Sequence, residues 1–421
     1  MNNLIKKIAG FSLLTVCSFL TYAQQDTVSL SECYVLAKEN YPLIKQYKLI
    51  AESSEYSLKN IEKGYLPRIS INGQASYQSD ITQLPKGIPG IPVLTKEQYK
   101  IYAEADQPIY DGGLVRSQKE LEEANANVQE KSLEVELYKI KDRINQLYFG
   151  ILFIDEQLKQ NDLLKKDLQL GLDKINALIE NGTALKSNGD VLKAELLKAG
   201  QQSVELIYNR KSLSSMLGLF IKKTLDENTY FIKPANLVAS AEIKRPELLM
   251  FDYRKKIFDA QDHLITAKNN PKLNFFVQGG LGKPAFNILS NNPDLFYIGG
   301  IRVSFPLSGF YTTKNERSIL RIGKQNIDAE RETFLFNTQL ALSQQSADVN
   351  KLNQFLKSDD AIISLRTSVK KTSLAQLENG VITSADYLRE VHAEDSAKQN
   401  KILHEIQLLI AQYTQQNITG N

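Results

Sequence analysis

Three histidines are the side chains of this sequence that could bind a transition metal or transfer a proton near neutral pH. They are His263, His392 and His404, and no two of them stand at the spacing that places two metal ligands on one turn of a helix. We therefore expect no zinc or haem site.

The segment GGLGKP at 279–284 has the composition of a phosphate-binding loop. It lacks the Gly-x-x-x-x-Gly-Lys-Ser/Thr spacing that wraps backbone amides around phosphate, so a turn at the end of a strand explains it better. Carboxylates are numerous but spread over helix positions expected to face solvent, and the chain has no tryptophan and no alternation of aromatic and basic residues that would stack bases. The sequence thus predicts neither an enzyme nor a nucleic-acid-binding protein, and no cofactor.

The first 23 residues have the features of a cleaved signal peptide. Two lysines precede an apolar run that ends in TYA at 21–23, a pattern that signal peptidase cuts, so the mature chain is expected to begin near Gln24. Lipidation would require Cys17, and the bulky Val16 before it disfavours that alternative. No other stretch is continuously apolar over the roughly 20 residues that a spanning helix needs, so we expect no helical membrane anchor.

Loss of the signal peptide would remove two lysines and lower the formal net charge from +3 to about +1, which is too balanced for a nucleic-acid-binding surface. It would also leave Cys33 as the one cysteine, so no intramolecular disulfide can form. The fold has to be stabilised by packing alone.

An internal repeat organises the chain. The segment 41–67 is answered by 245–271, with two prolines paired at an offset of 204. The turn around Pro108 is answered by the one around Pro306, and LIENGTALKSNGDVLKAE around Gly182 by LENGVITSADYLREVHAE around Gly380, both at an offset of 198. The sequence therefore predicts a tandem duplication, with one repeat over 24–240 and the other over 241–421.

Four strands are expected, two in each repeat. Residues with apolar and polar side chains alternate in the first two strands, with Ile69, Ile71, Ala75 and Tyr77 set against serine, asparagine and glutamine, as in a sheet with one apolar face. The expected strands cover 69–79, 99–109, 272–282 and 296–306. Each has about the length at which a tilted strand crosses a bilayer, although a soluble, half-buried sheet would show the same pattern.

Apolar residues recur every three and four positions after Gly113, which predicts long helices that pack side by side. The two longest are expected over 114–181 and 313–379, each roughly 100 Å at 1.5 Å per residue. Shorter helices are expected over 30–64, 188–217, 245–269 and 384–417. The fold class is therefore mainly α with β. An ordinary coiled-coil dimer would explain the helices but neither the strands nor the duplication.

Taken in order, SLSECYVLAKENYPLIK, GYLPRISINGQASYQ, DQPIYDGG and LENGVITSADYLREVHAE closely resemble segments of the TolC family of outer-membrane efflux and secretion channels. The resemblance covers about 24–417. It implies a TolC-like homotrimer in which each protomer gives four strands to a shared 12-stranded transmembrane β-barrel. It also implies that the long helices form a tunnel across the periplasm.

The resemblance also implies a set of site residues. Gly182 and Gly380 would form the periplasmic tip turns, Asp386 matches an aperture aspartate, and Asp190 matches an aspartate that helps to lock the closed state. Arg389 stands where a second aperture aspartate is expected, and a salt-bridged ring of Asp386 and Arg389 is a hypothesis. The alternative is that Asp386 and Asp190 only cap the helices that follow the turns. Leu377 and Ile382 depart from the tyrosine and arginine that latch the first tip in the family.

The predicted function is a passive exit duct in the outer membrane of a Gram-negative cell, extending into the periplasm. Its expected partners are a periplasmic adaptor, an inner-membrane transporter and outer-membrane lipid. The alternative from a different class is a periplasmic coiled-coil adaptor or interaction protein without a pore, which predicts one hairpin between lipoyl-like halves. The transported substrate and the class of transporter are not specified by these residues.

Overall fold

The computed structural model describes residues 27–81, 95–237 and 242–421. The expected signal peptide, including Cys17, lies outside these residues. The chain folds into two compact units. We call Met1–Leu36, Gln146–Ala235 and Ile362–Ile402 the hairpin unit, and Ala37–Asn145, Asn236–Ala361 and Leu403–Asn421 the sheet unit. Each unit draws on both predicted repeats, so the repeats are not separate compact domains.

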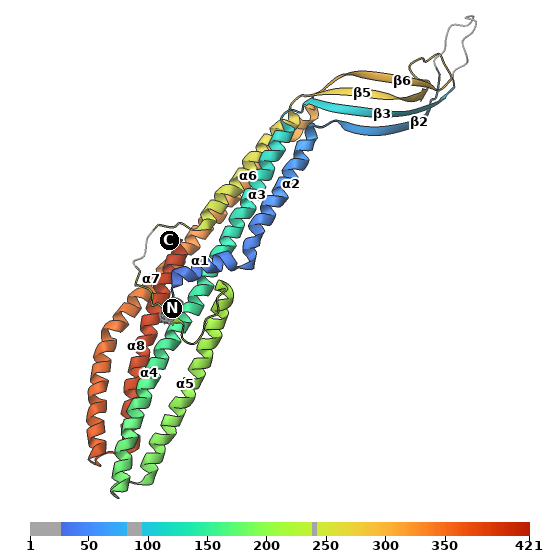
Figure 1. Cartoon of the computed structure of the whole chain (residues 1–421). Coiled ribbons are helices and arrows are strands. Elements are labelled where there is room, and N and C mark those ends of the chain that lie inside the picture. The colour runs from blue at the N-terminus through green and yellow to red at the C-terminus, as the bar shows by residue number, and fades with distance from the viewer. Residues whose placement is uncertain (1–26, 82–94, 238–241) are drawn as a thin grey trace, which may run out of the picture. The chain divides into compact units, whose positions relative to one another are not determined.

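Helices make up most of the described chain (Figure 1). The α-helices are α1 (Leu30–Asn40), α2 (Gln46–Glu62), α3 (Leu114–Tyr138), α4 (Ile140–Glu180), α5 (Lys186–Ile221), α6 (Pro246–Asn269), α7 (Phe310–Glu378) and α8 (Ser384–Thr419). Three short 3-10 turns are η1 (Pro42–Lys45), η2 (Lys63–Tyr65) and η3 (Leu307–Gly309). Within the described ranges, none of the helices combines the length and hydropathy needed to cross a membrane.

Two helices expected to be continuous are interrupted. The helix expected over 30–64 is divided into α1, η1 and α2, because Pro42 excludes helical backbone at the preceding residue and Tyr41 is extended with ψ 130°. The helix expected over 114–181 is divided at Lys139 between α3 and α4, and nothing in the structure explains that break. Pro246, in contrast, occupies the first turn of α6, where its missing N–H is tolerated.

In the described part of the chain, six strands form two sheets. In the hairpin unit, β1 (Thr27–Val28) pairs in parallel with β4 (Tyr230–Phe231), and the buried Tyr148 hydroxyl lies 2.8 Å from the carbonyl oxygens of both Val28 and Ile232. The sheet unit holds the four antiparallel strands expected from the sequence. They are β2 (Arg68–Tyr77), β3 (Glu97–Tyr110), β5 (Lys272–Lys283) and β6 (Asp294–Ser304), in the order β2-β3-β5-β6. The GGLGKP segment begins within β5 and ends in the turn after it.

In the sheet unit, α6 and α7 are joined by a ladder of ion pairs. Arg317 lies 2.8 Å from Asp262, and the remaining pairs are Lys324 with Asp259, Lys255 with Asp328, Arg254 with Glu330, and Arg331 with Asp252. The partners run in opposite directions along the two helices, so the ladder fixes their antiparallel register. Exposed pairs add little stability each. Many carboxylates expected only to face solvent thus bind a neighbouring helix.

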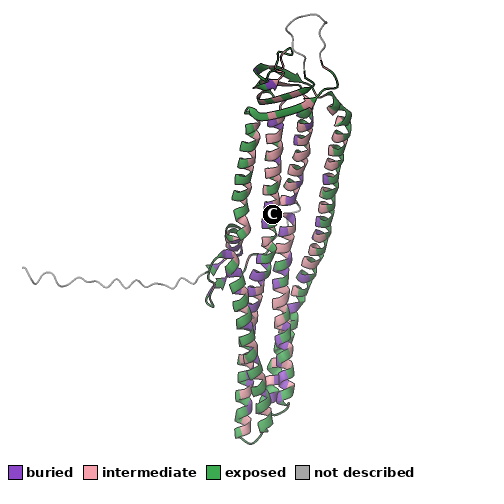
Figure 2. Ribbon diagram, turned by 90° about the vertical axis from the view of Figure 1, so that its right-hand side faces the viewer, coloured by how far each residue is buried: buried purple, intermediate pink, exposed green. Residues whose placement is uncertain are grey.

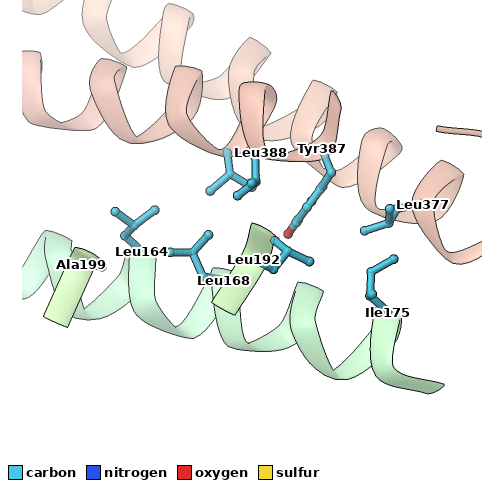
Figure 3. Close-up of a cluster of buried hydrophobic side chains, with 9 residues drawn as sticks. Leu164, Leu168, Ile175, Leu192, Ala199, Leu377, Tyr387 and Leu388 are labelled. Carbon is cyan, nitrogen blue, oxygen red and sulfur yellow. The ribbon is translucent and has the colours of Figure 1, made fainter. Parts of the chain in front are cut away.

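The core of the hairpin unit lies where α4, α5, α7 and α8 meet (Figure 3). The heptad pattern places Leu164, Leu168 and Ile175 of α4 against Leu192 of α5, and the ring of Tyr387 points from α8 toward α4. Burial raises the pKa of Tyr387 to about 12, so its hydroxyl stays neutral. Figure 2 shows buried residues spaced along the helices, in contrast to the mostly exposed strands.

Three of these helices, α4, α7 and α8, also carry a partly buried polar cluster, consisting of Lys370, Asp167, Glu394, Asp395 and Gln160. The Lys370 amine lies 2.7 Å from Asp167 and 2.6 Å from Glu394, which is almost fully buried. Burial opposes ionisation of Glu394, but hydrogen bonds led by that from Lys370 outweigh it and lower the pKa of this carboxyl.

Asp395, next to it, has no such cation on its carboxylate. Its oxygens accept hydrogen bonds from the amides of Gln160 at 2.8 Å and Gln399 at 2.7 Å. Burial raises its pKa, and those amides with the more distant charges of His392 and Lys398 offset only part of this. The ionised form is therefore held at a cost in free energy.

We expect Asp395→Asn to stabilise the hairpin unit at neutral pH, because it removes a charge that burial disfavours. A carboxyl group whose pKa is raised in the folded state stabilises that state below the ordinary aspartate pKa of about 3.9. This stability is lost as the pH rises through the pKa of the folded state. Thermal unfolding followed by circular dichroism should show a higher midpoint than wild type at pH 7 and no difference near pH 3. A lower midpoint at pH 7 would show that the carboxylate is needed in its charged form.

Candidate functional site

The two hairpins of the hairpin unit end in the same backbone turn. Gly182 has φ +73° and Gly380 has φ +70°, the left-handed conformation that only glycine adopts without strain. In the turn between α4 and α5, the N–H of Gly182 donates to Ile179 and that of Thr183 to Leu178. This pair of bonds is the Schellman motif, which satisfies carbonyls left free at a helix C-terminus.

The turn between α7 and α8 repeats these bonds at positions 198 higher. The N–H of Gly380 donates to Leu377, and the N–H of Val381 donates to Gln376. Both glycines expected from the sequence as turn residues are therefore at the turns. The equivalence supports the tandem duplication, which remains a prediction from the sequence.

Asp386 caps α8. Its carboxylate accepts from the Thr383 hydroxyl at 2.7 Å and the Thr383 N–H at 3.2 Å, while the N–H of Asp386 donates to the Thr383 hydroxyl at 3.2 Å. This reciprocal arrangement is a capping box. The hydrogen bonds from Thr383, with a further contribution from Arg389, lower the pKa of Asp386. The exposed Arg389 guanidinium lies 3.3 Å from Asp386 of the same chain.

Asp190 does not cap α5, contrary to the capping alternative. The residue equivalent to Thr383 is Leu185, which has no hydroxyl, and α5 begins without a side-chain capping bond. Asp190 lies beyond the first turn of α5 and is exposed. Asn188, at the position equivalent to Asp386, donates its N–H to the carbonyl of Leu185. The two turns are alike in backbone but differ in the polar groups they present.

The residues that depart from the family pattern contribute to packing. Leu377 is 1% exposed in the cluster shown in Figure 3, and Ile382 packs against the same cluster. They hold the second turn through apolar contact.

The four-stranded sheet has one apolar and one polar face, fixed by its register. The apolar face carries Ile69, Ile71, Ala75, Tyr77, Tyr99, Ile101, Ala103, Ala105, Leu273, Phe275, Val277, Leu281, Leu295, Tyr297, Ile301 and Val303. Large side chains on this face are exposed, with Ile71 at 79% and Tyr297 at 85%. On the polar face, the side chains of Glu104 and Asp106 are only 17% and 18% exposed, whereas Arg68, Ser70 and Gln74 of β2 are exposed. A water-soluble sheet would bury a face with this many large apolar side chains.

A charge cluster lies on the polar face near the helix end of the strands. Arg302 of β6 lies 3.2 Å from Glu104 and 3.3 Å from Asp106 of β3, and Asn274 of β5 donates to Asp106 at 2.7 Å. The sequence predicted the strands that carry Arg302 and Asn274. It did not identify their carboxylate partners, because the pairing of β3 with β5 joins segments 168 residues apart.

The histidines lie apart from one another, each beside one carboxylate. His263 lies 3.0 Å from Glu120, His404 lies 2.8 Å from Asp359, and His392 lies 3.5 Å from Glu195. In the part of the chain that the structure describes, no three His, Cys, Asp or Glu side chains gather so that they could hold a metal ion.

A hollow of about 890 Å³ in the hairpin unit lies beside the segment that follows α5. Arg210 closes one side, bound to Asp155 at 2.5 Å and to the carbonyl of Thr229 at 2.8 Å. These partners occupy the hydrogen-bond donors of the Arg210 guanidinium. Arg210 therefore holds the segment after α5 in place.

The capping box should protect the start of α8 and leave α5 unaffected. We expect Asp386→Ala to speed hydrogen exchange of the first-turn amides of α8 at neutral pH, and Asp190→Ala, as a matched control, to leave α5 unchanged. A lowered native pKa gives stability that is present above about pH 3.9, the ordinary aspartate pKa, and is lost as pH falls through the native value. The difference between Asp386→Ala and wild type should therefore vanish in strong acid. Equal effects of the two substitutions would contradict the assignment.

No protein-family model and no curated protein sequence matches the chain. Solved structures do. The outer membrane protein VceC from Vibrio cholerae matches with a TM-score of 0.65 at 9% identity, over 93% of this chain and 96% of that one. The Campylobacter jejuni CmeC outer membrane channel matches with 0.62 at 12%, over 93% and 85%.

The Neisseria gonorrhoeae MtrE outer membrane channel, in its open state, matches with a TM-score of 0.63 at 14% identity, over 93% of this chain and 89% of that one. Each of these matches covers 93% of this chain. The fold of the single chain is the one that the resemblance to the TolC family implied. The chain therefore has the fold of these outer-membrane channels.

Proposed function

We propose that the protein is a passive duct through the outer membrane, open to the periplasm, and performs no chemistry. The observation that carries this proposal is a sheet that separates apolar from polar side chains on its two faces and leaves large apolar side chains exposed. Hydrocarbon is the solvent that favours such a face, and the polar face would line an aqueous path.

The edges of the sheet support a shared barrel. β2 and β6 each pair on one side only, so in lipid their free N–H and C=O groups would cost several kcal/mol each. Four strands cannot close on themselves, whereas three copies would give twelve, enough for an aqueous lumen. We therefore propose a homotrimer, as the TolC family implies.

Partners follow from the lack of an energy source in the sequence. The chain carries no recognisable nucleotide-binding motif, so direction and energy would come from an inner-membrane transporter through a periplasmic adaptor. The alternative of a coiled-coil adaptor without a pore leaves the sheet and the second hairpin without a role.

We place the aperture at the hairpin turns, with Gly182 and Gly380 as tip turns and Asp386, Arg389 and Asp190 as its charged residues. Arg389 contacts Asp386 within one chain, so the pair would reduce the negative charge at the aperture instead of leaving bare carboxylates. The similar MtrE channel was solved in an open state, and this supports an aperture that can open.

Single-channel recording in planar bilayers tests the function. The purified mature protein should be a trimer in detergent and should give small currents. We expect Arg389→Ala to make these currents more cation-selective, because it leaves Asp386 unpaired, and Asp386→Ala to increase the conductance by opening the aperture.

Lys222→Ala is a matched control, because Lys222 is a basic residue at the far end of α5. A soluble monomer or dimer without conductance would refute the duct. Trimers that conduct, but whose closed-state conductance and selectivity are unchanged by Arg389→Ala, would refute only the placement of the aperture.

A further inference from the structure

The polar face of the sheet carries aromatic rings at the end away from the charge cluster. Tyr102 of β3 and Phe296 of β6 lie on either side of Gly280 of β5 in one line of cross-strand neighbours. A Cβ at Gly280 would lie 2.1 Å from the carbonyl oxygen of Ile101, so no side chain fits there. The two rings meet across the glycine, with their centroids 6.3 Å apart.

A third ring comes from the segment between β5 and β6. Phe286 packs edge-on to Phe296, with centroids 5.1 Å apart. Phe296 is only 7% exposed, whereas Phe286 remains 56% exposed. The cluster therefore offers an apolar surface to the space in front of the polar face, an unusual feature for the side of the sheet that would contact water.

Lys100 places its charge on these rings. Its ammonium nitrogen lies 4.8 Å from the centroid of Tyr102 and 4.5 Å from that of Phe296. Among the described residues, no carboxylate lies within ion-pair distance of it. Arg302 also lies over a ring, Phe276 at 4.5 Å, but Glu104 and Asp106 neutralise it. Lys100 is thus the cation on this face whose charge is balanced by rings alone.

An unneutralised ammonium beside exposed aromatic surface has a definite chemical preference. Cation–π contacts at exposed sites are weak, so the flexible lysine stem can lift the ammonium to meet an anion without disturbing the sheet. An anionic group would bind the ammonium while an attached apolar group covers Phe286 and Phe296. A cationic solute would be repelled by Lys100, and a simple anion would gain nothing from the rings.

We propose that Lys100, Tyr102, Phe286 and Phe296 form a binding site for amphipathic organic anions on the polar face of the sheet. The inference rests on the proposed duct and names a class of cargo for it: small molecules that join an aromatic group to a carboxylate or sulfonate. With three copies, the site would occur three times around the exit path.

The experiment measures block of single-channel current by a naphthalene sulfonate, and separately the fluorescence of the same probe on the detergent-solubilised trimer. Lys100→Gln should weaken block by about tenfold, as expected for loss of one charge-assisted contact. Phe286→Ser should weaken block several-fold, and its exposed position makes misfolding a minor concern. Methanesulfonate, which has no ring, should not block.

Lys272→Gln is the matched control. Lys272 of β5 lies on the same polar face of the sheet as Lys100 but at the other end of the strands, where it is paired with Ser304 of β6. If Lys272→Gln weakens block as much as Lys100→Gln, only the overall charge of the path matters and the site is refuted. Block unaffected by Phe286→Ser would refute the role of the rings.

Absence of any current would refute the duct, and the fluorescence titration would then decide on the site by itself. Wild-type binding that depends on both Lys100 and Phe286 would uphold it, and binding that depends on neither would overturn it.

Discussion

A β-sheet cannot leave its edge strands unpaired where no water can reach them, and this constraint governs the rest of the molecule. The sheet unit ends in β2 on one side and β6 on the other, each with a row of free backbone groups. Its apolar face also carries exposed large side chains. In the proposed duct, strands of other copies would pair with the edges, and lipid would cover the apolar face. The helices position this sheet, and the α6–α7 ion-pair ladder fixes the register of two of them.

The type of fold, the strands of the larger sheet and the long helices could be predicted from the sequence, whereas the short strands β1 and β4 could not. Apolar residues recur every two positions along the strands and every three or four positions along the helices. This spacing shows which side of an element is apolar, so all four strands of the sheet and the long helices could be located. The errors were local. The helix over 30–64 was expected to be continuous, yet α1 ends before Pro42, because the proline restricts the residue before it. The break at Lys139 has no counterpart in residue type or spacing.

The candidate sites were less predictable, because they depend on contacts between distant segments. Gly182 and Gly380 could be identified as turn residues, since glycine is favoured where φ is positive. The roles of Asp386 and Asp190 could not be separated by composition, because what distinguishes them is the residue at the helix start: a threonine that completes a capping box in one case and a leucine in the other. The contact of Lys100 with Phe296 could not be predicted either, because it depends on how β3, β5 and β6 pair.

The two hairpin turns have one further consequence, for symmetry. Their backbones are so alike that a trimer would present six turns of one geometry. Only three of the six would carry the Thr383–Asp386 cap and the guanidinium of Arg389. A ligand or partner that recognises backbone shape would find six equivalent turns, whereas one that recognises charge would find three. In the predicted duplication, the two copies would share the backbone of the turn and differ in the charged groups that they carry.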